Sequence, residues 1–354
     1  MTSSLRFLSV FILSLLAPFS IQATIFTVTN TADTGPGSLR GHITQAQPND
    51  TIRFSIQGTI FLDSTIWLTK NLHIQGPGPD KIIVDGKQLS RLFRIQQGDT
   101  LHFSGMTFQN GNGIEDTSRA VSGGAFINEG FLILRNAIFY KNIAKNGGAI
   151  ENAGYASNAE LDMAFCTFYE NRAIEVNDTI FNTAFGGGAI YVNGNGKGRS
   201  VVRARNCTFS NNFAAESGGG MYLFGDISGG TELFSINCTF TENSSNGAGG
   251  IRNERYASII LTNSIVSDNE GNANAPDIQG YILSNGNNLI GKVGNALFTP
   301  DSTDIIGESA LLAPLELNGG SLPTHALSCL SPAIDAGNDL LAYPTDQRGQ
   351  TRIG

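Results

Sequence analysis

A short pattern recurs five times through the middle of the chain and restricts the possible folds more than any other feature. Its copies have eight residues each and read RNAIFYKN (135–142), AFCTFYEN (164–171), RNCTFSNN (205–212), INCTFTEN (236–243) and TNSIVSDN (262–269). Between them lies a second block that starts with two glycines, as in GGAFIN and GGAIEN. Two short apolar blocks that alternate roughly every 30 residues predict a coil of parallel β-strands, because helical solenoids need a 3.6-residue period that is absent here.

The residue columns of the repeat predict which side chains face inward. Before the bend of each copy, every second residue is apolar, and after the bend the inward set resumes one residue out of phase. The residue at the slip is usually asparagine, which tolerates the left-handed backbone of a bend. These bend asparagines are Asn136, Asn206, Asn237 and Asn263, with Phe165 as the exception.

Two further asparagine properties follow from stacking. Coils stacked about 4.8 Å apart would let the bend asparagines hydrogen-bond to one another as a ladder. A second asparagine column closes the strand after the bend, at Asn142, Asn171, Asn212, Asn243 and Asn269. The double glycines fit corners that need a positive φ or have no room for a side chain.

The four cysteines do not suggest a disulfide framework. Three of them, Cys166, Cys207 and Cys238, share one inward column of the repeat, and Cys329 lies outside it. We expect the three to be small buried side chains, since in-register parallel neighbours seldom meet the geometry of a disulfide.

The region before the repeat has the same design in a looser form, with short alternating strands separated by Gly, Pro and Asp. The segment Gly35–Gln47 predicts a short helix, with Ser38 as its N-cap and Leu39, Ile43 and Ala46 on one face. A solenoid has open ends, so this helix is expected to cover the first coil. The fold class is therefore an all-β parallel β-helix of roughly ten coils with an N-terminal capping helix.

Composition limits the partners. The chain has 354 residues, a formal net charge of -8 and 43 glycines. Its net charge is negative, with no excess of basic residues, which disfavours nucleic acid and anionic membranes as partners and leaves polysaccharides or other proteins. Residues 1–23 have one arginine, an apolar run and a small-residue end, which predicts a secretory signal and no membrane span in the mature chain. We expect a monomer that is secreted or displayed on a cell surface.

Three segments resemble known families. Residues 26–62, starting FTVTNTADTGPGSLRGH, resemble the N-terminal cap of secreted right-handed parallel β-helix proteins, and the GGA(I) and FxxN blocks resemble those of chlamydial polymorphic outer-membrane proteins. The pattern NGG…THAL…SPAIDAG…TDQRG in 318–349 is similar to the choice-of-anchor Q domain. The resemblance implies a right-handed, bacterial exported or surface β-helix. We divide the chain after residue 23 into 24–110 (cap and first coils), 111–285 (repeats) and 286–354 (last coils and anchor-like motif).

Candidate chemistry is sparse. The outward columns before the bend place Asp162 beside Arg203 of the next coil, with Arg135 and Arg205 nearby, a cluster that could hold a uronate carboxylate bidentately. A solvated strand face with an ion pair is the plainer interpretation. No second carboxylate stacks on Asp162 in its column, so the paired acids of a glycosidase are not predicted there. Asp335 and Asp346 could hold the last coil in place, or less plausibly bind Ca²⁺, and no other cofactor is expected.

The glycine-rich stretch FGGGAIYVNGNGKGRS (185–200) raises the question of a phosphate loop. Its Lys197 is followed by Gly198 where a phosphate loop has Ser or Thr, so a nucleotide site is not predicted. Its first half is a repeat corner, and its second half is an insertion that we expect to form a flexible loop. Together with the insertion at 174–185 it would lie along one side of the rod.

Two functions fit these observations. The preferred one is a non-enzymatic β-helix that acts as a surface or extracellular structural, adhesive or carbohydrate-binding module. The alternative is a polysaccharide lyase or glycoside hydrolase that uses the face around Asp162, Arg203 and Arg205, because the same fold also carries such enzymes.

Overall fold

The computed structural model describes residues 23–114, 121–175, 186–254, 256–341 and 343–352. It confirms a parallel β-helix: successive coils stack in register along one axis, and their strands form long parallel ladders. The predicted export signal at 1–23 falls almost wholly outside the described residues. Within the described part of the chain, none of the helices has the length and apolar character needed to cross a membrane.

Each coil contributes to three walls, which we call A, B and C. Wall A precedes the bend and runs through β1 (Ile25–Val28), β2 (Thr51–Phe54), β5 (Leu72–Gln75), the first halves of β8 (Thr100–Gln109), β10 (Phe131–Tyr140) and β13 (Ala159–Tyr169), then β16 (Ser200–Arg205), β20 (Thr231–Ile236), β24 (Ala257–Thr262), β27 (Tyr281–Ser284) and β29 (Leu297–Thr299). These eleven strands among the described residues agree with the expected number of coils.

Wall B follows the bend, and wall C follows the glycine corner. Wall B contains β3 (Gly58–Phe61), β6 (Ile82–Asp85), the second halves of β8, β10 and β13, then β17 (Thr208–Ser210), β21 (Thr239–Thr241), β25 (Ile265–Val266), β28 (Leu289–Ile290) and β30 (Ile305–Ile306). Wall C contains β4 (Ile66–Leu68), β7 (Phe93–Ile95), β9 (Phe126–Asn128), β12 (Ile150–Ala153), β15 (Ile190–Gly194), β19 (Met221–Gly225), β23 (Ile251–Asn253) and β26 (Ile278–Gln279). Between walls B and C lie four short strands: β11 (Ile143–Ala144), β14 (Arg172–Ala173), β18 (Phe213–Ala214) and β22 (Ser244–Ser245).

The core is a stack of identical side chains. The predicted phenylalanine column is fully buried, and the ring centroids of successive pairs from Phe108 through Phe139, Phe168 and Phe209 to Phe240 are 5.1, 4.4, 4.9 and 4.4 Å apart. The three cysteines of the neighbouring column are buried and free, as expected, and burial raises the pKa of the Cys207 and Cys238 thiols well above its usual range. Cys329 is exposed.

The second asparagine column forms an unbroken ladder. Each Nδ2 donates to the Oδ1 of the asparagine one coil further on, at 2.9, 2.9, 2.8 and 2.9 Å from Asn142 to Asn269. Each Nδ2 also donates to a buried phenylalanine carbonyl, for example from Asn212 to Phe168 at 3.0 Å. The ladder ends on the buried carboxylate of Asp277, which accepts from Asn269 at 2.8 Å. The ladder thus connects each coil of the repeat region to the next at the equivalent residue.

The bend asparagines differ from the prediction. The left-handed backbone is confirmed, with φ of 50° at Asn136, 48° at Asn206, 55° at Asn237 and 49° at Asn263, and also at Phe165. Their side chains do not bond to one another: Asn206 donates to the carbonyl of Thr345, and Asn263 donates to that of Asn338. The bends therefore serve as a docking strip for the C-terminal segment.

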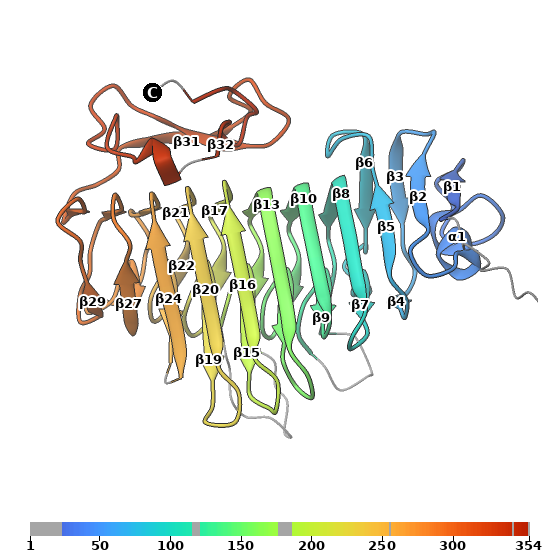
Figure 1. Cartoon of the computed structure of the whole chain (residues 1–354), viewed down its shortest axis with the longest axis horizontal. Helices are drawn as coiled ribbons and strands as arrows, with labels where there is room; N and C mark the ends of the chain where they lie inside the picture. Colours follow the sequence, from blue (N-terminus) through green and yellow to red (C-terminus); the bar gives the residue numbers. More distant parts are fainter. Residues whose placement is uncertain (1–22, 115–120, 176–185, 255, 342, 353–354) are drawn as a thin grey trace, which may run out of the picture.

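The chain after the last coil folds back along this strip (Figure 1). The C-terminal segment, residues 308–352, contains an antiparallel pair of β31 (Leu312–Glu316) and β32 (Thr324–Leu327) and the short 3-10 helix η1 (Asp339–Leu341). Its contacts reach from Asn136, which accepts from Ser321, to Asn287, which donates to the Ala336 carbonyl. Of the region 286–354, predicted as last coils with an anchor-like motif, the first part continues the coils through β30, and the part that carries the motif packs against the side of the rod.

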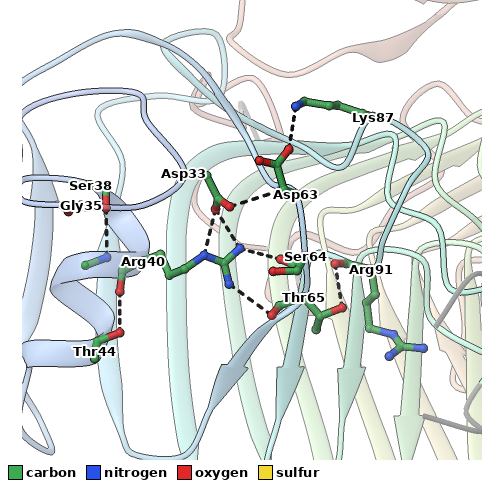
Figure 2. Close-up of polar contacts among 11 residues, drawn as sticks. Asp33, Gly35, Ser38, Arg40, Thr44, Asp63, Ser64, Thr65, Lys87 and Arg91 are labelled. Atoms are coloured by element: carbon green, nitrogen blue, oxygen red, sulfur yellow. Dashed lines mark hydrogen bonds and ion pairs between the residues drawn. The ribbon is translucent and has the colours of Figure 1, made fainter. Parts of the chain in front are cut away.

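The side chain of one arginine connects the N-terminal cap to the β-helix. Helix α1 (Leu39–Gln45) starts at Ser38, whose Oγ accepts from the Gly41 amide at 3.1 Å, and Leu39 and Ile43 are buried as predicted. Arg40 forms an ion pair with Asp33 at 2.8 Å and donates to the Ser64 carbonyl at 2.6 Å and to the Thr65 carbonyl at 3.3 Å, as Figure 2 shows. The cap therefore covers the first coil and is tied to the corner that leads into wall C.

Candidate functional site

The outward face of wall A carries the predicted charged cluster. On this face Asp162 of β13 lies in register with Arg203 of β16, and Arg205 lies in register with Ala164. Arg135 of β10 occupies the coil before, also beside Ala164. The strand alternation that buries Leu161 and Met163 points these four charged side chains outward, so the sequence prediction of their neighbourhood is confirmed.

The ion pairs within the cluster are distributed over two carboxylates. Asp162 is held between two arginines, with Oδ1 at 2.7 Å from Nη2 of Arg135 and Oδ2 at 3.0 Å from Nη1 of Arg205. The hydrogen bond and charge of Asp162 raise the pKa of Arg205, although burial, the largest single contribution, opposes this. Arg203 pairs with Glu160 instead of its register neighbour Asp162.

Sequence reasoning missed Glu160 and Glu232. Glu160 lies two residues before Asp162 on the same side of β13, and Glu232 lies in the same column one coil beyond Val201. Glu232 pairs with Arg199, which precedes β16. The period-two alternation that places Asp162 outward also places Glu160 outward. The sequence therefore contained the signal for Glu160, in the outward column next to that of Asp162.

The face has more basic than acidic groups, in contrast to the acidic chain as a whole. On the described wall A strands the arginines number four and the carboxylates three: Arg53, Arg135, Arg203 and Arg205 against Glu160, Asp162 and Glu232. The side chains of Arg135, Arg203 and Arg205 are 35, 34 and 24% exposed, so they remain within reach of a ligand.

Apolar side chains alternate with these charges. Phe234 follows Arg203 in the same column, and the Arg203 guanidinium lies 5.6 Å from the centre of its ring. Ile133, Ile236 and Ile260 are half-buried on the same face. Such a surface offers both charged donors and flat apolar contacts, which is the combination that a sugar ring with a carboxylate can use.

The second predicted location lies in the C-terminal segment. Asp346 is bound to Arg348 at 2.6 Å and accepts from the amides of Arg348 and Gln350. Asp335 and Asp346 both line a cavity of about 840 Å³ between this segment and the bends. No group of three histidine, cysteine or carboxylate side chains suited to a metal ion occurs in the described parts of the chain. Ca²⁺ binding at the two aspartates stays an untested prediction.

The glycine-rich insertion at 193–200 is packed against its neighbours. The Lys197 amide donates to the Tyr155 carbonyl at 3.1 Å, and the Gly198 amide donates to the Gly154 carbonyl at 3.1 Å. A Cβ on Gly198 would lie 1.9 Å from the Ser157 carbonyl oxygen, so a side chain cannot fit there. The glycines allow close stacking of turns, which corrects the expectation of a flexible loop. Most of the other insertion, 176–185, lies outside the described residues.

Comparison with known proteins adds no family. No protein-family model matches the chain, and no curated protein matches it. The resemblances to choice-of-anchor Q domains and to chlamydial surface repeats therefore stay predictions from sequence.

Proposed function

We propose that this protein is an exported β-helix that binds an acidic, uronate-containing polysaccharide through the outward face of wall A. The observation that carries the proposal is the grouping of Arg135, Arg203 and Arg205 on neighbouring strands of one outward face of an acidic chain. Arginine is the side chain best suited to planar, bidentate recognition of a carboxylate. The rod would act as a binding or adhesive module at a bacterial cell surface or outside the cell.

The present ion pairs are compatible with ligand binding. Surface pairs contribute about 0 to 1 kcal/mol each, so a ligand carboxylate can replace Glu160 or Asp162 as the partner of an arginine at small expense. Strands in a sheet lie about 4.8 Å apart, so the arginines of β10 and β16, which are two strands apart, present donors about 10 Å apart along the rod. An extended polyanion running along the rod axis would contact Arg135 on β10 and then Arg203 and Arg205 together on β16, two coils further on.

Export is part of the same proposal. It is supported by the sequence pattern of residues 1–23 and by the likeness of 318–349 to surface-anchored proteins. Cell fractionation followed by protease treatment of intact cells tests it, and cytoplasmic retention of the full-length chain would contradict it.

Binding is tested by affinity electrophoresis and calorimetry with polygalacturonate as the acidic probe and dextran as the neutral one. The Arg203→Ala/Arg205→Ala variant should bind polygalacturonate at least about tenfold more weakly, the equivalent of about 1.4 kcal/mol. Arg252→Ala is the matched control, because Arg252 lies on wall C, pairs with Glu254 and is similarly exposed. Equal binding by the double variant and the wild type, or equal binding of dextran, would refute the proposal.

The enzymatic alternative rests on Glu160 and Asp162. The two residues lie two positions apart on one face of β13, and paired carboxyl groups on one face are the groups that act in glycoside hydrolysis. Both are ion-paired with arginines, however, whereas an acid catalyst needs surroundings that keep it protonated. Assaying reducing ends and unsaturated products from polygalacturonate, with and without Ca²⁺, separates the two functions: turnover that is lost in Asp162→Ala would establish the enzyme.

A further inference from the structure

Two histidines face each other on wall A, three coils before the centre of the arginine-rich face. His73 of β5 and His102 of β8 are in register on adjacent strands, and both point outward. Their Nδ1 atoms lie 3.4 Å apart, with ring planes at 81° and ring centroids 5.6 Å apart. His73 is exposed and His102 is half-buried. Neither side chain has a role in the face described above.

The separation of the two nitrogens matches the bite of a metal ion. Zn²⁺ binds histidine nitrogen at about 2.0–2.1 Å with tetrahedral geometry, which puts two ligand nitrogens on one ion about 3.3–3.4 Å apart. In-register parallel strands hold the two residues about 4.8 Å apart, and the ring orientations in this structure bring the two nitrogens to the required separation. We propose that His73 and His102 form a two-histidine site for a nitrogen-preferring divalent transition metal ion, with Zn²⁺ as the probe ion.

The protonation state of His102 suits this role. Burial, with the nearby charges of His73 and Arg135, lowers the pKa of His102, so its imidazole is neutral and able to act as a ligand near neutral pH. The charge of Arg135 that acts on His102 is offset by the ion pair of Arg135 with Asp162. Arg53 lies in the next column, where its Nε donates to Gln75.

Metal binding needs only a tautomer change. Without metal, a single Nδ1–H of one ring donates to the bare Nδ1 of the other. When the ion binds, both Nδ1 atoms supply lone pairs, and the donor ring moves its proton from Nδ1 to Nε2, so no net proton is released. If the donor is His102, its Nε2 is available to take the proton, because among the described residues that atom is buried and has no hydrogen-bond partner.

The donor set determines which ions are expected. Two imidazoles suit Zn²⁺, Cu²⁺ and Ni²⁺, whereas Ca²⁺ and Mg²⁺ need oxygen ligands. Since no third histidine, cysteine or carboxylate completes a cluster in the described residues, the remaining positions are open to water or an external ligand. The site should therefore bind a metal reversibly and leave it accessible from solvent.

Calorimetry with Zn²⁺ tests the site on the tag-free mature chain. All proteins carry Cys329→Ser, because Cys329 is free and exposed and an accessible thiolate can itself bind zinc. One Zn²⁺ should bind per chain, His73→Asn and His102→Asn should each weaken binding at least about tenfold, and the double variant should not bind. Gln75→Ala is the matched control, since Gln75 lies on the same strand and face without an imidazole. Ca²⁺ should give no binding heat.

A spectroscopic measurement on the otherwise unchanged Cys329→Ser chain guards against variants that fail to fold. In a long-range proton–nitrogen spectrum, Zn²⁺ should move the Nδ1 signals of His73 and His102 and leave those of His42 and His325 in place. His42 and His325 serve as internal controls because their ring nitrogens are bonded to the carbonyls of Thr27 and Ala313. Unchanged Nδ1 signals for the pair, absence of saturable binding, or full binding by the double variant would each overturn the proposal.

Discussion

Removing one amide from the asparagine ladder should destabilise the whole rod. The side chain of Asn212 is fully buried, donates to the Phe168 carbonyl at 3.0 Å and to Asn243 at 2.8 Å, and accepts from the amide and the side chain of Asn171 at 3.0 and 2.9 Å. Asn212→Ala removes all four hydrogen bonds. It leaves the Asn171 amide and the Phe168 carbonyl buried without these partners.

The magnitude follows from the groups that lose partners. A buried donor or acceptor left unsatisfied costs about 1–3 kcal/mol, so two backbone groups give roughly 2–6 kcal/mol, and we expect a loss of about 4 kcal/mol in the free energy of unfolding. Unfolding entropy of about 2.1 cal/mol/K per residue makes each kcal/mol worth roughly 1.5 °C in a chain of this size. The melting temperature should therefore fall by about 6 °C.

Differential scanning calorimetry, supported by denaturant titration, measures this loss. Asn246→Ala is the matched control, because Asn246 is exposed and donates only one hydrogen bond, to the Ala215 carbonyl at 2.7 Å. Its melting temperature should change by less than about 1.5 °C. If Asn212→Ala were no more damaging than Asn246→Ala, the ladder would not be a structural element and the reasoning would fail.

Three further predictions concern the core, the C-terminal segment and the end of the ladder. Phe209→Ala should lose about 3–5 kcal/mol in a denaturant titration, because it opens a cavity in the middle of the phenylalanine stack. Asn263→Gly keeps the left-handed bend but removes both side-chain bonds to Asn338, so limited proteolysis should cut within 308–352 sooner while the melting temperature of the rod changes little. Burial raises the pKa of Asp277. A carboxyl group whose pKa is raised in the folded state contributes stability at low pH, and this contribution is lost as pH rises through that pKa. The wild type should therefore gain stability relative to Asp277→Asn as pH falls from 7 toward 4, and a stability difference that does not change with pH would contradict this.

The rod itself could be predicted from sequence because its contacts repeat. The slip in alternation at Asn136 and its equivalents locates each bend, and the structure has positive φ at these positions. The phenylalanine and cysteine columns are aligned by the same spacing, so their burial follows from one register. The cap helix was accessible from local signals, since Ser38 and the apolar face are contiguous in sequence.

The C-terminal segment and the ion pairs could not be predicted in the same way. The hydrogen bonds between the bends and this segment join residues far apart in sequence, such as Asn206 and Thr345, and no sequence repeat predicts them. Register placed Asp162 beside Arg203, but side-chain rotamers decide which carboxylate each arginine binds, and Arg203 binds Glu160. The facing of His73 and His102 likewise depends on ring orientation, which an alternation pattern does not contain.

The central claim is that wall A is the polysaccharide-binding surface, and hydrogen exchange in the presence of polygalacturonate tests it most directly. The account predicts slower exchange in β10 and β16, where the arginines lie, and in β13 between them, with no change in β12, β15 and β19 of wall C. Protection of the wall C strands, or binding without any protection of β10, β13 and β16, would contradict it.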